Sequence, residues 1–414
     1  MDKISSLPDP ILCHILSFLP TQISGRTSVL ARRWRFLWTY VRKLDFDKSD
    51  CGSESKLSFA DMVYRVLLLH NGSIDSFRIF SDGGDSNCQI DAWVSTAIAR
   101  NVQILYLSHV WLPPCCFKCQ SLVEFTIHYS SISVKSGAVC LPRLEKLTLF
   151  CNYYENDESL PNLVSGCSVL EYMCIDREVC DNMNRCYVCS STLKSFITSG
   201  FLCCELDHEH KLVLDIPAVQ YLEIGDQYSP IIGAKMLSSL VVADIYFYND
   251  FEEKSRDVFQ FVEKLSNAKR LKFTSGNPMN LLNPTFSFPT MRFHNLTRLD
   301  FTVDWRLLTE FLECANKLES LTIGEVKEEL KFWREPKHLP KCLSSSLKYV
   351  SILGFAGGKH ELTLARFILR HAKVLETIKI YSESSVADAH SELVMLKKIS
   401  EFPRGSPKCG LTFI

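Results

Sequence analysis

Two short stretches, LVEFTIH at residues 122–128 and LEKLTLF at residues 144–150, share one pattern of apolar residues. Each begins with leucine, has a second apolar residue three places on, and has a third two places after that. Residues two apart on a strand point to the same side, so the last two apolar residues face one side of a short β-strand. The first one is expected to anchor the turn before the strand. The pattern therefore predicts strands with one buried face.

The same spacing recurs from residue 41 onward. It starts at Val41, Ile74, Val102, Leu122, Leu144, Leu170, Leu193, Val219, Leu237, Ala268, Leu296, Leu318, Leu347 and Leu375. These fourteen positions span 334 residues, a mean step of about 26, within the roughly 20–29 residues of leucine-rich repeats. The Leu193 unit is incomplete because Thr198 holds its third place.

One such unit cannot bury its apolar face alone, whereas stacked units bury a continuous core. We therefore expect an α/β fold: an N-terminal helical segment followed by a leucine-rich-repeat solenoid, or horseshoe, with parallel strands on its concave face. Residues 362–371 and 391–399 are expected to be covering helices. An ordinary α/β protein with similarly spaced strands is the weaker alternative, because it does not account for so many matches in order.

The first forty residues follow a helical period instead. An apolar stripe is formed by Leu7, Ile11, Leu12, Ile15, Leu16 and Leu19. Pro8 sits near the expected helix start, where a missing N–H costs nothing, and Pro20 ends the run. A second helical stretch is expected over residues 27–40. So few residues cannot form a self-sufficient core, so the stripe is expected to pack into a partner's groove as well as internally.

This N-terminal segment resembles the F-box family in its plant form. The matching stretches are LPDPILCHILSFLPT at residues 7–21, RTSVLARRWRFLW at residues 26–38 and VRKLDFD at residues 41–47. The resemblance implies a compact three-helix unit that binds the Skp-type adaptor of a Skp–cullin–F-box ubiquitin ligase. The implied adaptor-binding residues are Leu7, Pro8, Ile11, Ile15, Leu16, Leu19, Val29, Leu30 and Trp34.

The segment departs from the family pattern at one place. Ile23, Ser24 and Gly25 stand where members usually have an acid and two small or apolar residues. A glycine inside a helix lowers its stability by about 1 kcal/mol relative to alanine. We expect a reduced affinity for the adaptor.

The C-terminus resembles the FBD module, which follows F-box and repeat segments in many plant proteins. The resemblance covers residues 341–355, 361–380 and 401–413. We expect three domains: an F-box at residues 1–45, leucine-rich repeats at 46–335, and an FBD module at 336–414 that closes the solenoid. The whole chain is thus similar to the plant F-box/FBD/leucine-rich-repeat family.

Composition narrows the class of protein. Apolar residues make up 46 % and charged residues 22 % of the chain, as in ordinary folded proteins, and the formal net charge is −1. A nucleic-acid binder would usually carry a basic surplus, and no apolar run is long enough for a membrane span, so neither partner is expected. The N-terminus lacks the order of a secretory signal. The 18 cysteines are therefore expected to be reduced thiols in the nucleus or cytoplasm.

Two motifs imitate functional sites. Zinc-like spacing is offered by Cys186, Cys189, Cys203, Cys204, His208 and His210, but a second C-x-x-C pair is missing, and buried cysteines are the better interpretation. GFAGGKHE at residues 354–361 looks like a phosphate loop, but His360 follows the lysine where Ser or Thr belongs, so a surface turn is expected. We expect no cofactor, no metal and no catalytic residues.

Residues that flank the buried pair of each strand are expected to face out on the concave side. Aromatic residues and arginine are favoured at binding hot spots. The expected target-binding residues are Tyr106, Tyr172, Tyr221, Arg270, Lys272, Arg298 and Tyr349. A solvated sheet face would give a similar polar set.

We conclude from the sequence that the chain is a non-catalytic substrate receptor of a ubiquitin ligase. It would bind the Skp-type adaptor, and through it a cullin, at one end and an unidentified target protein along the repeats, promoting ubiquitination and degradation. The alternative is a leucine-rich-repeat interaction protein that does not engage a ligase. A metal-dependent or nucleic-acid-binding module is disfavoured by the charge balance and the missing cysteine pair.

Overall fold

The computed structural model describes residues 4–50, 58–178, 182–201, 211–226, 231–247, 255–275, 292–382 and 389–414. These residues form two compact units that divide after Leu193. Unit 1 contains the helical N-terminal segment and the first repeats, and unit 2 contains the later repeats. No helix among the described residues is long and apolar enough to cross a membrane.

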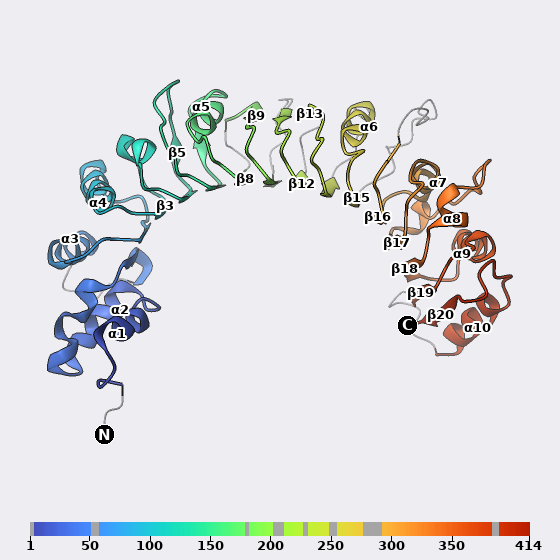
Figure 1. Ribbon diagram of the computed structural model, residues 1–414, viewed down its shortest axis with the longest axis horizontal. Coiled ribbons are helices and arrows are strands. Elements are labelled where there is room, and N and C mark those ends of the chain that lie inside the picture. Colours follow the sequence, from blue (N-terminus) through green and yellow to red (C-terminus); the bar gives the residue numbers. More distant parts are fainter. Residues whose placement is uncertain are drawn as a thin grey trace. The chain divides into compact units, whose positions relative to one another are not determined.

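Unit 1 combines a helical segment with a parallel sheet (Figure 1). Its α-helices are α1 (Asp9–Leu16), α2 (Thr21–Arg26), α3 (Phe59–Leu69), α4 (Asn87–Ala99) and α5 (Ser159–Ser165). Its 3₁₀ helices are η1 (Thr27–Val29), η2 (Arg32–Tyr40), η3 (Lys48–Asp50) and η4 (Pro114–Lys118). Its strands are β1 (Lys43–Asp47), β2 (Ser76–Phe80), β3 (Ile104–Ser108), β4 (Glu124–His128), β5 (Ser131–Ile132), β6 (Lys146–Phe150), β7 (Tyr153–Tyr154), β8 (Tyr172–Glu178) and β9 (Arg185–Cys189).

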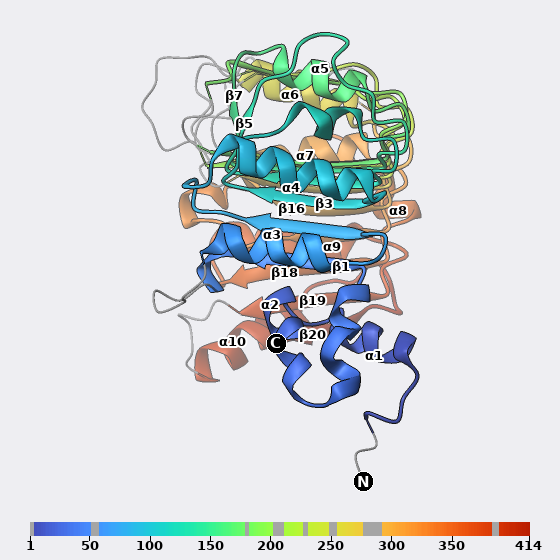
Figure 2. The ribbon, with the colours of Figure 1, turned by 90° about the vertical axis from the view of Figure 1, so that its left-hand side faces the viewer.

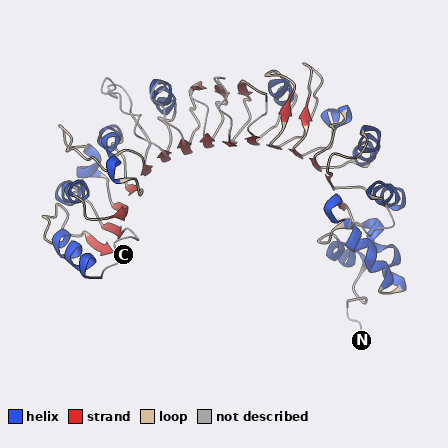
Figure 3. Cartoon of the chain, turned by 180° about the vertical axis from the view of Figure 1, so that it is seen from behind, coloured by secondary structure: helices blue, strands red, loops and turns tan. Residues whose placement is uncertain are grey.

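The strands of unit 1 pair in parallel in the order β1-β2-β3-β4-β6-β8. The predicted apolar positions lie in register: Phe125 and Ile127 of β4 stand opposite Leu147 and Leu149 of β6, and all four side chains are 0 % exposed. Helices α3, α4 and α5 cover the outer side of these strands (Figures 1 and 3). The buried face predicted from the spacing is therefore the core between strands and helices.

Helices α3 and α4 stack side by side (Figure 2). The fully buried Trp93 of α4 is their common packing element, with edge-on ring contacts to Phe59 at 5.9 Å and Tyr64 at 5.6 Å. A capping box fixes the start of α4, where Ser86 and Gln89 satisfy each other's backbone N–H groups.

Successive repeats are joined by one recurring backbone arrangement. A single carbonyl of one repeat accepts hydrogen bonds from two consecutive N–H groups of the next. The carbonyl of Gln103 accepts from Val123 and Glu124, and that of Val123 accepts from Glu145 and Lys146. The same arrangement recurs in unit 2, where for example the carbonyl of Lys348 accepts from the N–H groups of Glu376 and Thr377. It sets which residue of one strand stands opposite which residue of the next.

Unit 2 continues the same design with more strands. Its strands are β10 (Ser195–Phe201), β11 (Lys211–Asp215), β12 (Tyr221–Asp226), β13 (Ile231–Ala234), β14 (Val242–Phe247), β15 (Arg270–Ser275), β16 (Arg298–Thr302), β17 (Ser320–Ile323), β18 (Tyr349–Phe355), β19 (Thr377–Ser382) and β20 (Gly410–Phe413). Its helices are α6 (Ser255–Lys264), α7 (Trp305–Cys314), η6 (Glu328–Leu330), α8 (Lys341–Ser345), α9 (Lys359–His371) and α10 (Ala389–Ser400).

The main sheet of unit 2 is parallel, in the order β10-β12-β14-β15-β16-β17-β18-β19-β20. The predicted covering helices at residues 362–371 and 391–399 lie within α9 and α10. Helices α6, α7 and α9 lie on the outer side (Figure 1), while the short parallel pair β11–β13 belongs to a separate sheet. The fold class predicted from the repeat spacing, an α/β leucine-rich-repeat solenoid behind an N-terminal helical segment, is confirmed.

The repeat assigned to Leu237 is wrong by three residues. The first two buried residues of β14 are Ala243 and Ile245, which pair with Leu222 and Ile224 of β12, whereas Val242 is half-buried on the opposite face. Two sets of residues satisfy the apolar template: the predicted one, in which Leu240 is the second residue, and the observed one, in which Leu240 is the first. Only the pairing of β14 with β12 distinguishes them, and the spacing of apolar residues within β14 does not predict that pairing.

The glycine-rich loop at residues 354–358 binds a carboxylate of the protein itself. Glu361, 1 % exposed, accepts hydrogen bonds from the N–H groups of Ala356 at 3.0 Å and Gly358 at 2.7 Å. Lys331, 3 % exposed, lies 2.8 Å from this carboxylate and also donates to the carbonyl of Gly354 at 2.9 Å. The loop amides that would hold a phosphate are thus already occupied, and Lys359 begins α9.

Replacing Lys331 by methionine is expected to destabilise unit 2 by about 3–5 kcal/mol, because it leaves the buried Glu361 charge without its partner. Removing both charges with Lys331→Met and Glu361→Gln together should cost less. The matched control is Lys348→Met, which breaks the half-exposed 3.6 Å pair with Glu319 and should cost about 0–1 kcal/mol. Urea unfolding monitored by circular dichroism measures all three. Equal losses for the two single variants would contradict the assignment.

Candidate adaptor-docking and target-binding surfaces

The helical N-terminal segment has a small core of its own. Its buried members are Leu12, Leu16, Trp34, Leu37 and Val41, against which Leu7, Cys13, Leu19, Ala31 and Trp38 pack. The helix predicted over residues 27–40 is divided into η1 and η2. The extended backbone of Ala31, with φ −159° and ψ 163°, separates them.

A second set of apolar side chains in this segment faces outward. On α1, Ile11 and Ile15 are 46 % and 39 % exposed, and Phe18, one helical turn further on, is 72 % exposed. After α2, Val29 is 87 % and Leu30 is 67 % exposed. Ile11 and Ile15 lie four residues apart on one face of α1, and exposed apolar side chains that share a face are typical of a surface that a partner covers.

The predicted adaptor-binding residues divide into three groups. Pro8, Ile11, Ile15, Val29 and Leu30 are exposed, and Leu7 and Leu19 are half-buried. Leu16 and Trp34 instead lie in the core, at 1 % and 6 % exposed, because the apolar stripe is wider than the face that a partner can reach. Contact of any of them with an adaptor stays a prediction. Sequence reasoning missed the exposed apolar residues Ile4, Phe18, Ile23, Phe36 and Tyr40.

The N-terminal residues are tied to η2 by polar contacts. The indole Nε1 of Trp34 donates to the hydroxyl of Ser5 at 2.8 Å. Arg33 forms a 2.7 Å ion pair with Asp9 at the start of α1 and also donates to the carbonyl of Ser5. These contacts hold α1 against η2, which positions Ile11 and Ile15.

The same segment caps the free edge of the first strand. The N–H of Asp45 in β1 donates to the hydroxyl of the buried Thr21 at 2.7 Å, and the N–H of Asn71 donates to the carbonyl of Thr39 at 3.0 Å. An uncovered strand edge invites association with other chains. The helical segment therefore serves as the terminal cap of the repeat array in unit 1.

His70 joins the cap to the first two repeats. It is buried, and its Nε2 lies 2.9 Å from the carbonyl oxygen of Val41, to which it donates. Its Nδ1 accepts from Arg100 at 3.0 Å and from the N–H of Gly72 at 3.3 Å. Burial is the main cause that lowers the pKa of His70, and the Arg100 charge adds to it.

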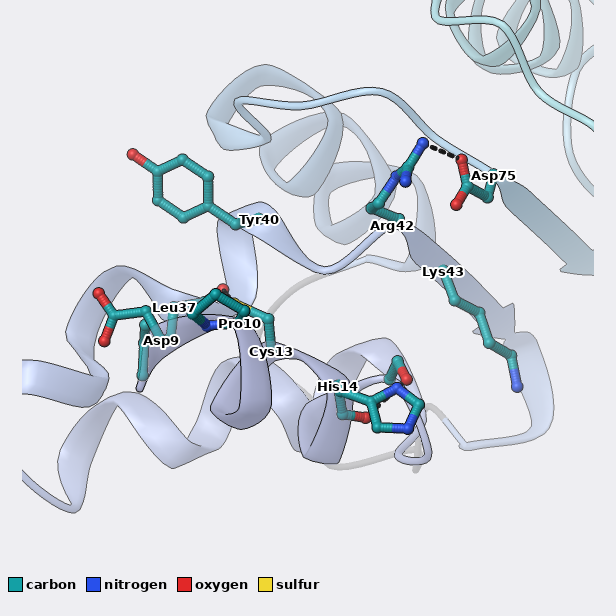
Figure 4. A pocket seen from close by; sticks show the side chains of 10 residues that line it. Asp9, Pro10, Cys13, His14, Leu37, Tyr40, Arg42, Lys43 and Asp75 are labelled. Carbon is teal, nitrogen blue, oxygen red and sulfur yellow. Dashed lines mark hydrogen bonds and ion pairs between the residues drawn. The ribbon is translucent and has the colours of Figure 1, made fainter. Parts of the chain in front are cut away.

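A pocket of about 640 Å³ opens beside α1 (Figure 4). Its walls include Cys13 and His14 of α1 and Tyr40 of η2, and the ion pair Arg42–Asp75 at 2.6 Å lies at its rim. Burial, and secondarily Asp9, raise the pKa of the Cys13 thiol, which donates to the carbonyl of Leu37 at 3.5 Å. A protonated, hydrogen-bonded thiol is a poor nucleophile.

The predicted target-binding residues all lie on the outward positions of their strands. In unit 1, Tyr106 contacts Nδ1 of His128 at 2.9 Å and lies under Arg78, and Tyr172 lies under Lys146. In unit 2, Tyr221 donates to Glu223 at 2.6 Å, Arg298 pairs with Asp300 at 3.1 Å, and Tyr349 donates to Glu376 at 2.9 Å. Arg270 and Lys272 are exposed.

Sequence reasoning missed a row of rings at the carboxyl ends of the unit 1 strands. His109 and Tyr129 stack at 4.6 Å, and Phe80 and Phe150 continue the row on either side at 5.5 and 5.7 Å. His109 and Tyr129 both have positive φ, 54° and 46°, which only a special turn imposes on residues other than glycine. His109 and Tyr129 each directly follow a strand, and this shared position in the sequence could have predicted that their rings lie side by side.

The zinc-like cysteine pair does not converge. Cys186 is buried and Cys189 is exposed at the end of β9, so the two point to opposite sides of that strand. Cys203, Cys204, His208 and His210 lie outside the described residues. Among the residues that the structure does describe, no group of three or more His, Cys, Asp or Glu side chains is arranged to hold a metal ion.

Three family models match the chain. The one described as "F-box domain" matches residues 4–46, "FBD-associated F-box protein At5g56370, LRR repeats" matches residues 90–240, and "FBD" matches residues 335–380. The predicted limits of the three domains stay predictions.

Curated relatives match over most or all of their length. F-box/FBD/LRR-repeat protein At5g56420 of Arabidopsis thaliana is 29 % identical, with 100 % of this chain and 99 % of the relative covered. F-box/FBD/LRR-repeat protein At4g26340 of the same plant is 28 % identical, with 100 % of both covered. F-box/LRR-repeat protein At3g59200, also from Arabidopsis thaliana, is 30 % identical, with 100 % of this chain and 88 % of the relative covered.

The fold and its two surfaces define an F-box protein with a protein-interaction role. The chain belongs to the plant F-box/FBD/leucine-rich-repeat protein family. An F-box domain is, in general, a module that binds a Skp-type adaptor, and members of this family are generally non-catalytic.

Lowering the pH should destabilise unit 1 through His70. Its folded-state pKa is lowered, so the unfolded chain binds the proton more readily, and stability present above about pH 6.5 is lost as pH falls below that value. Urea midpoints at about pH 7.5 and about pH 5.5 should differ less for His70→Gln than for the unaltered chain. His14→Gln, on the exposed side of α1, is the control and should keep the full difference. An unchanged difference in His70→Gln would contradict the role.

Gly25→Ala should strengthen the docking segment. Gly25 lies inside α2, and an added Cβ would meet nothing within 4 Å, so the gain in helix propensity of up to about 1 kcal/mol is not offset by a clash. Thermal unfolding should shift upward. Gly166→Ala is the opposite control, since its Cβ would lie 2.5 Å from Val139 and should destabilise. A lower melting temperature for Gly25→Ala would contradict the expectation.

Proposed function

We propose that this protein is the substrate-receptor subunit of a Skp–cullin–F-box ubiquitin ligase. The observation that carries the proposal is the outward apolar set of the F-box segment. Ile11, Ile15 and Phe18 remain exposed although the segment has its own core. Exposing large apolar side chains costs about 1.5–3 kcal/mol each relative to burial, so a covering partner is favoured.

The adaptor is the partner that the family match supports for this face. Leu16 and Trp34 would act from beneath it, by holding α1 and η2 in place, while the exposed residues make the contact. The cullin would be reached only through the adaptor, and the chemistry of ubiquitin transfer would belong to other subunits.

The target would bind the outward positions of the parallel strands. This face carries aromatic and charged side chains. The hydrogen bonds between successive repeats hold its backbone in register, which makes it a suitable scaffold for recognition. The target itself is unidentified. The expected compartment, nucleus or cytoplasm, remains a prediction.

The alternative is a leucine-rich-repeat interaction protein that does not engage a ligase. Two features of α2 favour it: Gly25 lowers helix stability, and the buried hydroxyl of Ser24 has no hydrogen-bond partner among the residues that the structure describes. A helix weakened at both positions would dock less firmly.

Co-purification separates the two. In the full chain, Ile11→Asp with Ile15→Asp should lower retention of a Skp-type adaptor by about tenfold or more, because two charges would enter an apolar interface. Leu68→Asp is the matched control, since Leu68 on α3 is 83 % exposed and lies outside the segment. Circular dichroism should show that the variants remain folded. Equal adaptor retention by the unaltered chain and the double variant would contradict the proposed role as a ligase subunit.

A further inference from the structure

The outward face of unit 2 contains a hollow of about 260 Å³ on β10, β12, β14 and β15. It arises at Gly225, which stands in register between Ser199 of β10 and Tyr246 of β14. The missing side chain leaves a gap in an otherwise continuous row. A Cβ on Gly225 would come no closer than 3.8 Å to any atom, so packing of the sheet does not require glycine here.

Carboxylates line one side of this hollow. Glu223 of β12 and Asp244 of β14 are direct neighbours in the sheet, and Lys272 of β15 follows in the same row. Neighbouring strands are about 4.8 Å apart, so a single cationic group can lie against both carboxylates. One oxygen of Glu223 is already engaged by the hydroxyl of Tyr221.

Asp244 has no hydrogen bond or close ion pair among the described residues, although Lys272 stands opposite it on β15. Burial is the main cause that raises the pKa of Asp244, and the charges of Glu223 and Asp300 add to this, while Lys272 and Arg270 act in the opposite direction. A half-buried carboxylate with no donor loses hydration without compensation, and an incoming donor would restore it.

Thr274 and Tyr246, which stand opposite each other on β15 and β14, also line the hollow. The hydroxyl oxygen of Thr274 is buried and has no hydrogen-bond partner among the described residues. The lining thus contains two acids and an aromatic residue, against the one amine of Lys272.

We propose that this hollow binds an arginine side chain of the target protein. The proposal rests on the function proposed above, since it names the chemistry of the surface that the receptor would use. A guanidinium has five N–H donors in a planar fork, enough to reach Asp244 and Glu223 together, and it stacks on aromatic rings. A lysine ammonium is a compact point charge with three donors and fits this arrangement less well.

An anionic occupant fits the same place poorly. It would face the field of two carboxylates, and Arg298 on the neighbouring strand β16 is already paired with Asp300.

The test uses the full chain purified with a Skp-type adaptor. Two immobilised pools of short random peptides are compared, one with a central arginine and one with citrulline, its uncharged near-isostere. The arginine pool should be retained about tenfold more or better, as expected for a charged hydrogen-bonded pair. Asp244→Asn should remove the preference, and Gly225→Val should remove it by filling the hollow. Asp300→Asn, in the same row but outside the lining, should keep it.

Unfolding midpoints of all variants establish that the sheet is intact, and the isosteric Asp244→Asn keeps the test decisive if Gly225→Val unfolds. Equal retention of the two pools, or an unchanged preference in folded Asp244→Asn, overturns the arginine site. Adaptor retention is measured in the same samples as a separate readout. If the unaltered chain shows no preference for the arginine pool but still binds the adaptor, this site alone is refuted. A preference that depends on Asp244 in a chain that retains no adaptor would refute only the ligase.

Discussion

The structure of this protein depends on one backbone interaction that is repeated at nearly every turn. A carbonyl of one repeat accepts two consecutive N–H groups of the next, as Gln103 does for Val123 and Glu124. This contact holds adjacent strands in register before any side chain is considered. Because side chains alternate along a strand, a slip of one residue would exchange the buried and outward faces. The ladder therefore determines both the core and the recognition surface.

A ladder of parallel strands must end somewhere, and its first edge is closed by the same residues that form the docking segment. Thr21 accepts the N–H of Asp45 at that edge, and His70 and Arg100 join the segment to the repeats behind it. The exposed apolar residues Ile11 and Ile15 are consequently held by a folded cap. Docking and capping thus share one core of a few buried side chains, which explains why so short a segment can be ordered.

Much of this could be predicted from the sequence because it is local. The apolar stripe from Leu7 to Leu19 and the repeated strand spacing both follow from the geometry of one helix or one strand. Even Thr198, which breaks the template, is buried at 6 % in the third place of its unit. The template failed at Leu237, where two registers fit equally well and only the pairing of Ala243 with Leu222 distinguishes them. The helical pattern also could not place Leu16 and Trp34 in the core. An apolar residue fits the same pattern whether a partner or the chain itself covers it.

The sequence by itself indicated the family through its motifs. It also determined the fold class and the position of most strands of the main sheets, because these rest on spacing within a few residues. Tertiary structure alone decided which apolar residues of the docking segment remain exposed, how Glu361 occupies the glycine-rich loop, and where the outward face is hollow. Gly225, Asp244 and Thr274 lie on three different strands and meet only because the ladder brings them into one row or the next. Residues so far apart in the chain share no local signal, so their joint chemistry appears only once the strands are paired.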